Sequence, residues 1–237
     1  MNLTIMGITA RGLFGRRRFL LLLPLPVLLV GMALLAEAGG ARPDEWAEPV
    51  LIGIGLAVLL PITALIVGTG VLGAEIDDGT VVHILAKPLP RSEIILAKLA
   101  VAWVVTAVTS AVPLFIAGVI ADSARLGAGL AAAAVLGALA YCAFFLALSL
   151  LSRRPVLLGL LYVLLWEGLL GNFVSGTRVL SIQQYVVSVA DKVAGTDLLT
   201  ATLGGPVSIV MALVFAVGFT WLAVDRLRSF SVAGETS

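Results

Sequence analysis

The sequence predicts an all-α membrane protein with six membrane-spanning helices and both termini in the cytoplasm. Of its 237 residues, 60% are hydrophobic and only 12% are charged, against about 25% charged residues in average soluble domains. Too few polar residues remain to cover a globular surface of this size. This composition excludes an ordinary soluble enzyme and a disordered regulator. The net charge of +1 provides no basic field for a nucleic acid, so no nucleic-acid partner is expected.

Six apolar stretches are long enough to cross a bilayer, whose core of about 30 Å needs roughly 20 helical residues. They are 19–36, 50–73, 94–121, 128–151, 156–173 and 207–224. The second is the clearest, because no charged residue lies between Val50 and Ala74. Four prolines fall inside these stretches, and we expect helix kinks near them: Pro24, Pro26, Pro61 and Pro113.

The basic residues set the orientation, because cytoplasmic segments carry an excess of Lys and Arg. With the N-terminus inside, 11 of the 15 basic residues lie on the cytoplasmic side. These are Arg11, Arg16, Arg17, Arg18, Lys87, Arg91, Lys98, Arg153, Arg154, Arg226 and Arg228. The other four are Arg42, Arg125, Arg178 and Lys192. We therefore expect a multi-pass protein of the cytoplasmic (inner) cell membrane.

The chain divides into a short N-terminal segment, 1–18, and a transmembrane domain, 19–237. Leu3, Met6, Ala10 and Leu13 repeat at helical spacing before three arginines, which predicts an amphipathic helix in the membrane interface. The alternative is a frayed N-terminus. Residues 16–38 also imitate a secretory signal, but removing them would worsen the charge balance, so we expect them to be retained.

Few residues inside the predicted spans can do chemistry. Glu167 is the only clear ionisable one, and such groups cost about 2.5–3.5 kcal/mol to insert. It is either a structural polar group that bonds a neighbouring helix or a residue of a transport pathway. One histidine, His83, and one cysteine, Cys142, cannot form a metal site or a disulfide. We expect no catalytic residue and no cofactor bound by this chain.

The loop at 74–93, between the second and third spans, is the most informative segment. Gly79 can end a helical turn, and Thr80 can cap a short helix over 81–86. Pro88 stops that helix, and Ser92 with Glu93 caps the third span. The short helix is more apolar than a solvated loop requires, which indicates a docking surface for another protein. The alternative is that it packs on the lipid headgroups.

These residues carry a family resemblance. The string Glu75-x-x-x-Gly79-Thr80, then Leu85-x-x-Pro88-x-x-Arg91 and Lys98, resembles a segment of type-2 ATP-binding-cassette (ABC) exporter permeases. The six spans, the cytoplasmic termini and the basic N-terminal segment agree with that family. Ser181-Ile182 with Tyr185 also resembles one branch of it.

The resemblance implies that the loop holds a coupling helix that docks on a cytosolic ABC ATPase. Glu75, Gly79, Thr80, Leu85, Pro88 and Arg91 would then form or shape the interface, and segment 1–18 would be the connecting helix beside it. Family members assemble two permeases, identical or different, with two ATPases. The phosphate-binding G-x-x-x-x-G-K-[ST] motif is absent from this sequence, so ATP and Mg would be bound by the partner subunit.

Two further expectations complete the prediction. The outer segment at 174–206 is too polar to span, and its apolar residues repeat at helical spacing, which predicts short amphipathic helices; a flexible outer loop is the alternative.

Aromatic side chains suggest walls for a hydrophobic or amphipathic substrate: Phe115, Phe144, Phe145, Tyr162 and Trp166. The competing functions are a secondary transporter or channel, and a non-transporting membrane assembly component.

Overall fold

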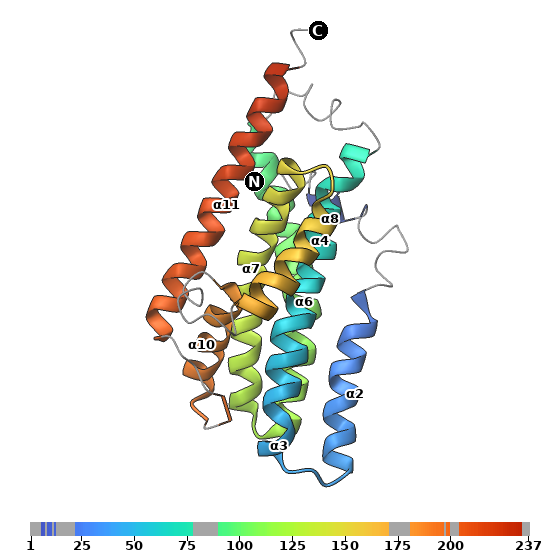
Figure 1. Cartoon of the computed structure of the whole chain (residues 1–237), viewed down its shortest axis with the longest axis vertical. Helices are drawn as coiled ribbons and strands as arrows, with labels where there is room; N and C mark the ends of the chain where they lie inside the picture. The colour runs from blue at the N-terminus through green and yellow to red at the C-terminus, as the bar shows by residue number, and fades with distance from the viewer. Residues whose placement is uncertain are drawn as a thin grey trace.

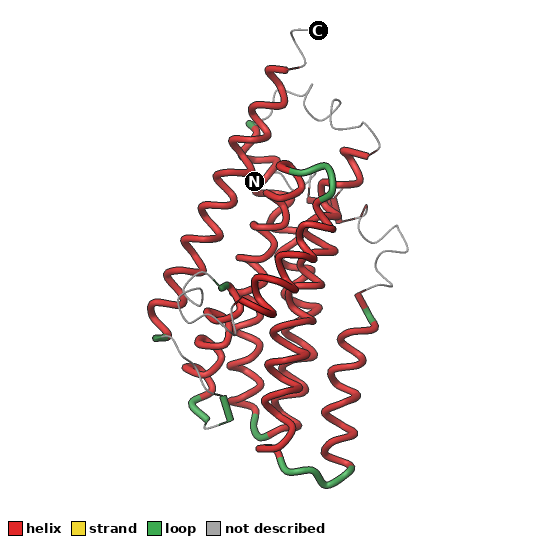
Figure 2. Tube along the Cα trace, in the orientation of Figure 1, coloured by secondary structure: helices red, strands yellow, loops and turns green. Residues whose placement is uncertain are grey.

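The computed structural model describes residues 6–7, 9–10, 12, 22–77, 90–170, 181–196, 198–199 and 204–233. All regular secondary structure in these ranges is helical (Figure 2). The α-helices are α2 (Pro24–Ala38), α3 (Pro43–Ala47), α4 (Leu60–Asp77), α6 (Arg91–Ala121), α7 (Ala124–Leu151), α8 (Pro155–Leu161), α10 (Ile182–Ala194) and α11 (Gly205–Ala233). Two π-helices, η2 (Glu48–Leu59) and η3 (Tyr162–Leu170), continue directly into or from α-helices. Of the predicted interfacial helix at 1–18, only residues 6, 7, 9, 10 and 12 are described, and they are helical.

Four helices of the described chain are long and apolar enough to cross a membrane: Pro43–Leu72, Arg91–Ala121, Ala124–Leu151 and Gly205–Ser229. They contain most of the second, third, fourth and sixth predicted spans. The first and fifth predicted spans correspond to shorter apolar helices, Pro24–Ala38 and Pro155–Gly168. The 15 residues of α2 cover only about 22 Å at 1.5 Å per residue. Residues 19–21 and 171–173 of these two predicted spans lie outside the described ranges.

Helix α7 is the centre of the bundle and packs against α4, α6, α10 and α11 (Figure 1). Glycines let its neighbours approach closely. A Cβ on Gly118 of α6 would lie 2.7 Å from the Cα of Gly127, and one on Gly129 would lie 2.8 Å from the carbonyl oxygen of Ala190 in α10. Such contacts leave no room for a side chain at these two positions, so the helices pack backbone to backbone there, as is common for helices in lipid.

The prolines act mainly at helix boundaries. Pro24 is the first residue of α2, where its missing N–H costs nothing, so α2 begins there instead of kinking there. Pro61 follows the junction at which η2 ends and α4 begins, and its lack of a backbone donor explains why the hydrogen-bond pattern changes at that point. Only Pro113 lies well inside a helix, the 31-residue α6.

The described basic residues separate between the two ends of the bundle. The α2–α3 connection, the α6–α7 turn and the end of α10 lie at one end, and the start of α8 and the end of α11 lie at the other (Figure 1). Elements at the second end carry Arg91, Arg153, Arg154, Arg226 and Arg228, whereas those at the first carry Arg42, Arg125 and Lys192. We call the second end the basic end.

Candidate functional site

The helices on either side of the 74–93 segment are well defined. Glu75 lies in the last turn of α4, and Arg91 is the first residue of α6 and is half-buried. Gly79, Thr80, Leu85 and Pro88 lie outside the described residues, as does His83. The structure therefore places the two ends of the predicted interface.

The predicted cap of the third span is wrong. Helix α6 begins at Arg91, after an extended Pro90, and has no side-chain cap. Proline readily adopts the extended conformation that precedes a helix. Glu93 lies in the first turn of α6. A carboxylate at that position favours the helix through the dipole, without capping it.

Lys98 joins the two helices that flank the segment. The charge count places Lys98 among the cytoplasmic residues, but its side chain is only 1% exposed. Its Nζ donates a hydrogen bond of 2.7 Å to the carbonyl oxygen of Val71 in α4. Deeper in the same seam, the Thr63 and Ser110 hydroxyls lie 3.0 Å apart. A buried ammonium group needs a hydrogen-bond acceptor, and the Val71 carbonyl provides one for Lys98. This hydrogen bond links the end of α4 to the start of α6.

Glu167 is the second buried charged side chain, with 2% exposure, and it lies near the end of η3. Its Oε1 accepts hydrogen bonds from the Tyr162 hydroxyl at 2.8 Å, the Tyr141 hydroxyl at 3.2 Å and the Ile182 N–H at 3.0 Å. Its Oε2 accepts from the Ser181 hydroxyl and from the Gln183 N–H at 3.4 Å. Five donors from three elements and one connecting residue therefore converge on this carboxylate.

The carboxylate completes the N-terminus of α10. The first N–H groups of a helix have no partner within the helix, and here those of Ile182 and Gln183 donate to Glu167. The third, from Gln184, donates to the Ser181 hydroxyl at 3.3 Å. The positive end of the helix dipole also favours a negative charge at this position. Glu167 thus fixes α10 to η3.

The π-helical geometry of η3 brings Tyr162 to Glu167. In an α-helix, residues five apart point in clearly different directions, because one turn takes 3.6 residues. A π-helix has a wider turn, with hydrogen bonds from i to i+5, so Tyr162 lies nearer the face of Glu167. This explains how a tyrosine from the same helix reaches the carboxylate.

Helix α10 is the amphipathic helix of the outer segment. It begins at the Ser181 cap and ends at Gly195, whose φ of 56° is left-handed, a conformation that glycine adopts readily. Its apolar residues Ile182, Val186 and Val189 are buried. The polar side chain of Ser188 is buried as well. The helix is therefore covered on more than its apolar side, chiefly by α7 and α11.

The aromatic residues do not share one wall. The Phe144 ring lies 4.4 Å from that of Tyr162 and 5.0 Å from that of Phe219, between centroids. Phe145 is fully buried, whereas Phe115 is 40% exposed on α6. The rings of α7, η3 and α11 thus form a packed cluster, whereas Phe115 lies on α6 outside these three elements.

The helical bundle, with four helices apolar enough to span a bilayer, defines a polytopic membrane protein. A family profile described as "ABC-2 family transporter protein" matches residues 16–174, which is more than half of the chain. The chain belongs to this family, and it is a permease component of an ABC transporter. The matched region includes the 74–93 segment and Glu167, and it ends before α10. No curated protein matches the sequence.

Family membership also limits the chemistry. ABC-2 membrane subunits are typically non-catalytic and associate with an ABC ATPase in a lipid bilayer. The hydrogen bonds of Glu167 and Lys98 agree with structural roles in such a subunit, because both side chains are occupied by partners within the chain.

Proposed function

We propose that this chain is the permease subunit of an ABC exporter that moves a hydrophobic or amphipathic substrate across the cytoplasmic membrane. ATP would be hydrolysed, with Mg, by a separate subunit. The match to the ABC-2 family across 16–174 is the observation that carries this proposal, because it spans both the 74–93 segment and the helices that flank it.

The 74–93 segment is proposed to dock on the ATPase. Leu85 and the short helix around it would provide the apolar contact, Gly79 and Thr80 the turn before it, and Pro88 its end. Glu75 and Arg91 lie at the two ends of the segment, in α4 and α6, and would make charged contacts.

The Lys98–Val71 hydrogen bond of 2.7 Å supports this mechanism. A displacement of the docked segment would act on α4 and α6 together, because the two helices are joined close to the segment. Rigid helices that move as a pair can switch between two packings of a bundle. In this way ATP binding on the partner would change which side of the membrane the pathway faces.

The proposed assembly contains two permeases, a second copy of this chain or a related one, and two ATPases. Each permease would have six spans, with both termini in the cytoplasm. The grouping of Arg91, Arg153, Arg154, Arg226 and Arg228 at the basic end supports placing that end inside, by the positive-inside rule.

The buried charges favour an apolar cargo over an ion. Among the described residues, only Lys98 and Glu167 are charged and buried, and both are hydrogen-bonded within the chain. A carrier of ions would need buried charges or open backbone carbonyls that face the pathway.

The test is co-purification of the full chain from its native membranes, followed by assay of ATP hydrolysis in the purified complex. Leu85→Asp and Gly79→Val should remove the bound ATPase, or leave it bound with hydrolysis that no longer responds to substrate. Ser152→Asp is the matched control. It introduces the same negative charge as Leu85→Asp, but at the basic end. The aspartate side chain can still accept the hydrogen bond that the Arg154 N–H donates to the Ser152 hydroxyl. Unchanged coupling in Leu85→Asp would contradict the interface.

A further inference from the structure

A groove runs along the outside of the bundle between α6, α7 and α11. It has a volume of about 520 Å³, within the range of about 300–1,000 Å³ typical of ligand sites. Its walls are apolar and include Leu96 and Leu99 of α6, Leu139 of α7, and Leu213 and Trp221 of α11. The groove does not include Glu167, and it shares only Ser92 with the 74–93 segment.

The two ends of the groove differ in polarity. Ser92 and Arg228 line its basic end, where α6 begins and α11 finishes. Thr220 is the other polar lining residue, and the rest of the lining is apolar. From Arg228 to Leu213 the groove follows 16 residues of α11, and the 15 steps between them cover about 22 Å at 1.5 Å per residue. The groove therefore has a polar entrance and an apolar length that exceeds half of a bilayer core of about 30 Å.

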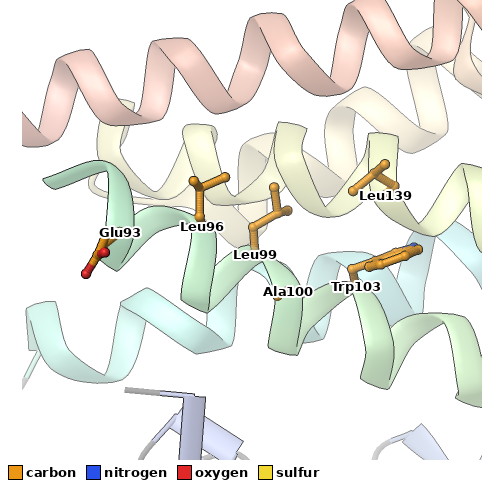
Figure 3. Close-up of a pocket in the computed structure, with 6 residues that line it drawn as sticks. All are labelled: Glu93, Leu96, Leu99, Ala100, Trp103 and Leu139. Atoms are coloured by element: carbon orange, nitrogen blue, oxygen red, sulfur yellow. The ribbon is translucent and has the colours of Figure 1, made fainter. Parts of the chain in front are cut away.

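An adjoining hollow shows how the side chains are arranged (Figure 3). Leu96 and Leu99 point toward the side of α11, and Leu139 of α7 lies between the two helices. The carboxylate of Glu93 points away from α11. Arg228 is thus the charged residue of the groove itself, and no carboxylate is among the groove's lining residues.

We propose that this groove binds one anionic phospholipid, with an acyl chain along α11 and the phosphate at Arg228. An apolar chain fits the slot, whereas an α-helix with its side chains is about 10 Å across and would need a far wider space over the same length. Basic pockets between membrane helices bind acidic head groups, and the guanidinium binds phosphate through paired hydrogen bonds. Arg228 has five donors, so it can bind phosphate in addition to neighbours within the chain.

Trp221 provides a direct probe, because it lines the groove and is 69% exposed. The full chain is reconstituted in nanodiscs of phosphatidylcholine that contain an equal small fraction of brominated phosphatidylglycerol or brominated phosphatidylcholine. Bromine quenches nearby tryptophan fluorescence, and the Trp221 signal is obtained by difference from Trp221→Phe. We expect the anionic lipid to compete for the site about fivefold better, the preference that one basic side chain gives near an anionic head group.

The variants then locate the charge. Arg228→Gln should abolish the preference for the anionic lipid, whereas Arg226→Gln should keep it, because Arg226 is exposed on α11 and is not among the groove's lining residues. Equal quenching by the two lipids in the wild type would overturn the proposal without the use of any variant. Absence of quenching by both lipids would show that no lipid occupies the groove, which would likewise overturn the proposal. Equal loss in the two variants would show diffuse attraction by surface charge, which also overturns it.

Discussion

The Glu167 carboxylate accepts the backbone N–H of Ile182 at 3.0 Å, and this contact joins the end of η3 to the first residue of α10. Both groups are buried, so neither can exchange its partner for water. The position of α10 on the bundle therefore depends in part on this side chain, in addition to the packing of α10 against α7 and α11.

Glu167→Gln should loosen α10. The amide would present N–H groups toward the Ser181 hydroxyl and the Gln183 N–H, which now donate to Oε2, and the favourable charge at the helix terminus would be lost. We expect a loss of about 2–3 kcal/mol of stability, the scale of hydrogen bonds to charged groups, measured as a lower Tm in detergent. Glu45→Gln, at an exposed site of α3, is the control. An unchanged Tm in Glu167→Gln would show that the carboxylate does not hold α10; unchanged flux would exclude it from the transport pathway.

Tyr162→Phe should remove one donor, at 2.8 Å from Oε1, while the ring still packs on Phe144. We expect a cost of about 1 kcal/mol in the wild type. In a Glu167→Ala background the same change should cost close to nothing, because the acceptor is gone. The double-mutant cycle measures this coupling, and additive effects would show that Tyr162 acts independently of Glu167.

Lys98→Met should separate α4 from α6 near the 74–93 segment. Methionine fills a similar volume but cannot donate to the Val71 carbonyl, 2.7 Å from Nζ. We expect faster hydrogen exchange at 70–77 and 91–98, by about tenfold for a local loss of about 1.4 kcal/mol, and weaker coupling of ATP hydrolysis to substrate. Lys192→Met, at an exposed site of α10, should change neither. Unaltered exchange in Lys98→Met would remove the proposed link.

Gly129→Ala should displace α10 from α7. The added Cβ would lie 2.8 Å from both the Ala190 oxygen and the Ala194 nitrogen, and backbone atoms cannot move aside as a flexible side chain can. We expect a loss of about 1–3 kcal/mol from overpacking. Gly218→Ala is the matched control in a helix, since nothing lies within 4 Å of its Cβ, and it should be neutral or stabilising by about 0.5–1 kcal/mol. Equal Tm values for the two variants would contradict the packing.

The membrane helices were predictable because hydropathy alone identifies them. The spans at 94–121, 128–151 and 207–224 lie within candidate spanning helices, and all but the last residue of 50–73 does so as well. Hydropathy did not show that α2 starts as late as Pro24, where a proline begins the helix. It also did not show the change from a π-helix to an α-helix before Pro61, because apolar composition is the same on both sides.

The site was predictable residue by residue but not in its contacts. Glu167 was identifiable as an isolated charge in an apolar run, whereas Ser181 was noted only in the family resemblance and not as a helix cap. That the two meet depends on tertiary packing, and Tyr141 lies 26 residues away in sequence. Lys98 appeared in the family motif, but its position near the end of an apolar span suggested a side chain exposed to solvent. Its hydrogen bond to the Val71 carbonyl was not predicted.

The most direct test of the account is cross-linking from the middle of the 74–93 segment. The chain has one cysteine, Cys142, which is buried, so Cys142→Ser with Leu85→Cys places a single thiol in that segment. A short thiol-to-amine cross-linker, applied to native membranes, should join this position to a chain that nucleotide photolabelling marks as an ATPase. The same thiol at Glu45, in α3 at the opposite end of the bundle, should not react with that chain. A nucleotide-binding chain captured from neither position, or equally from both, would contradict the claim that a separate ATPase drives this permease through the 74–93 segment.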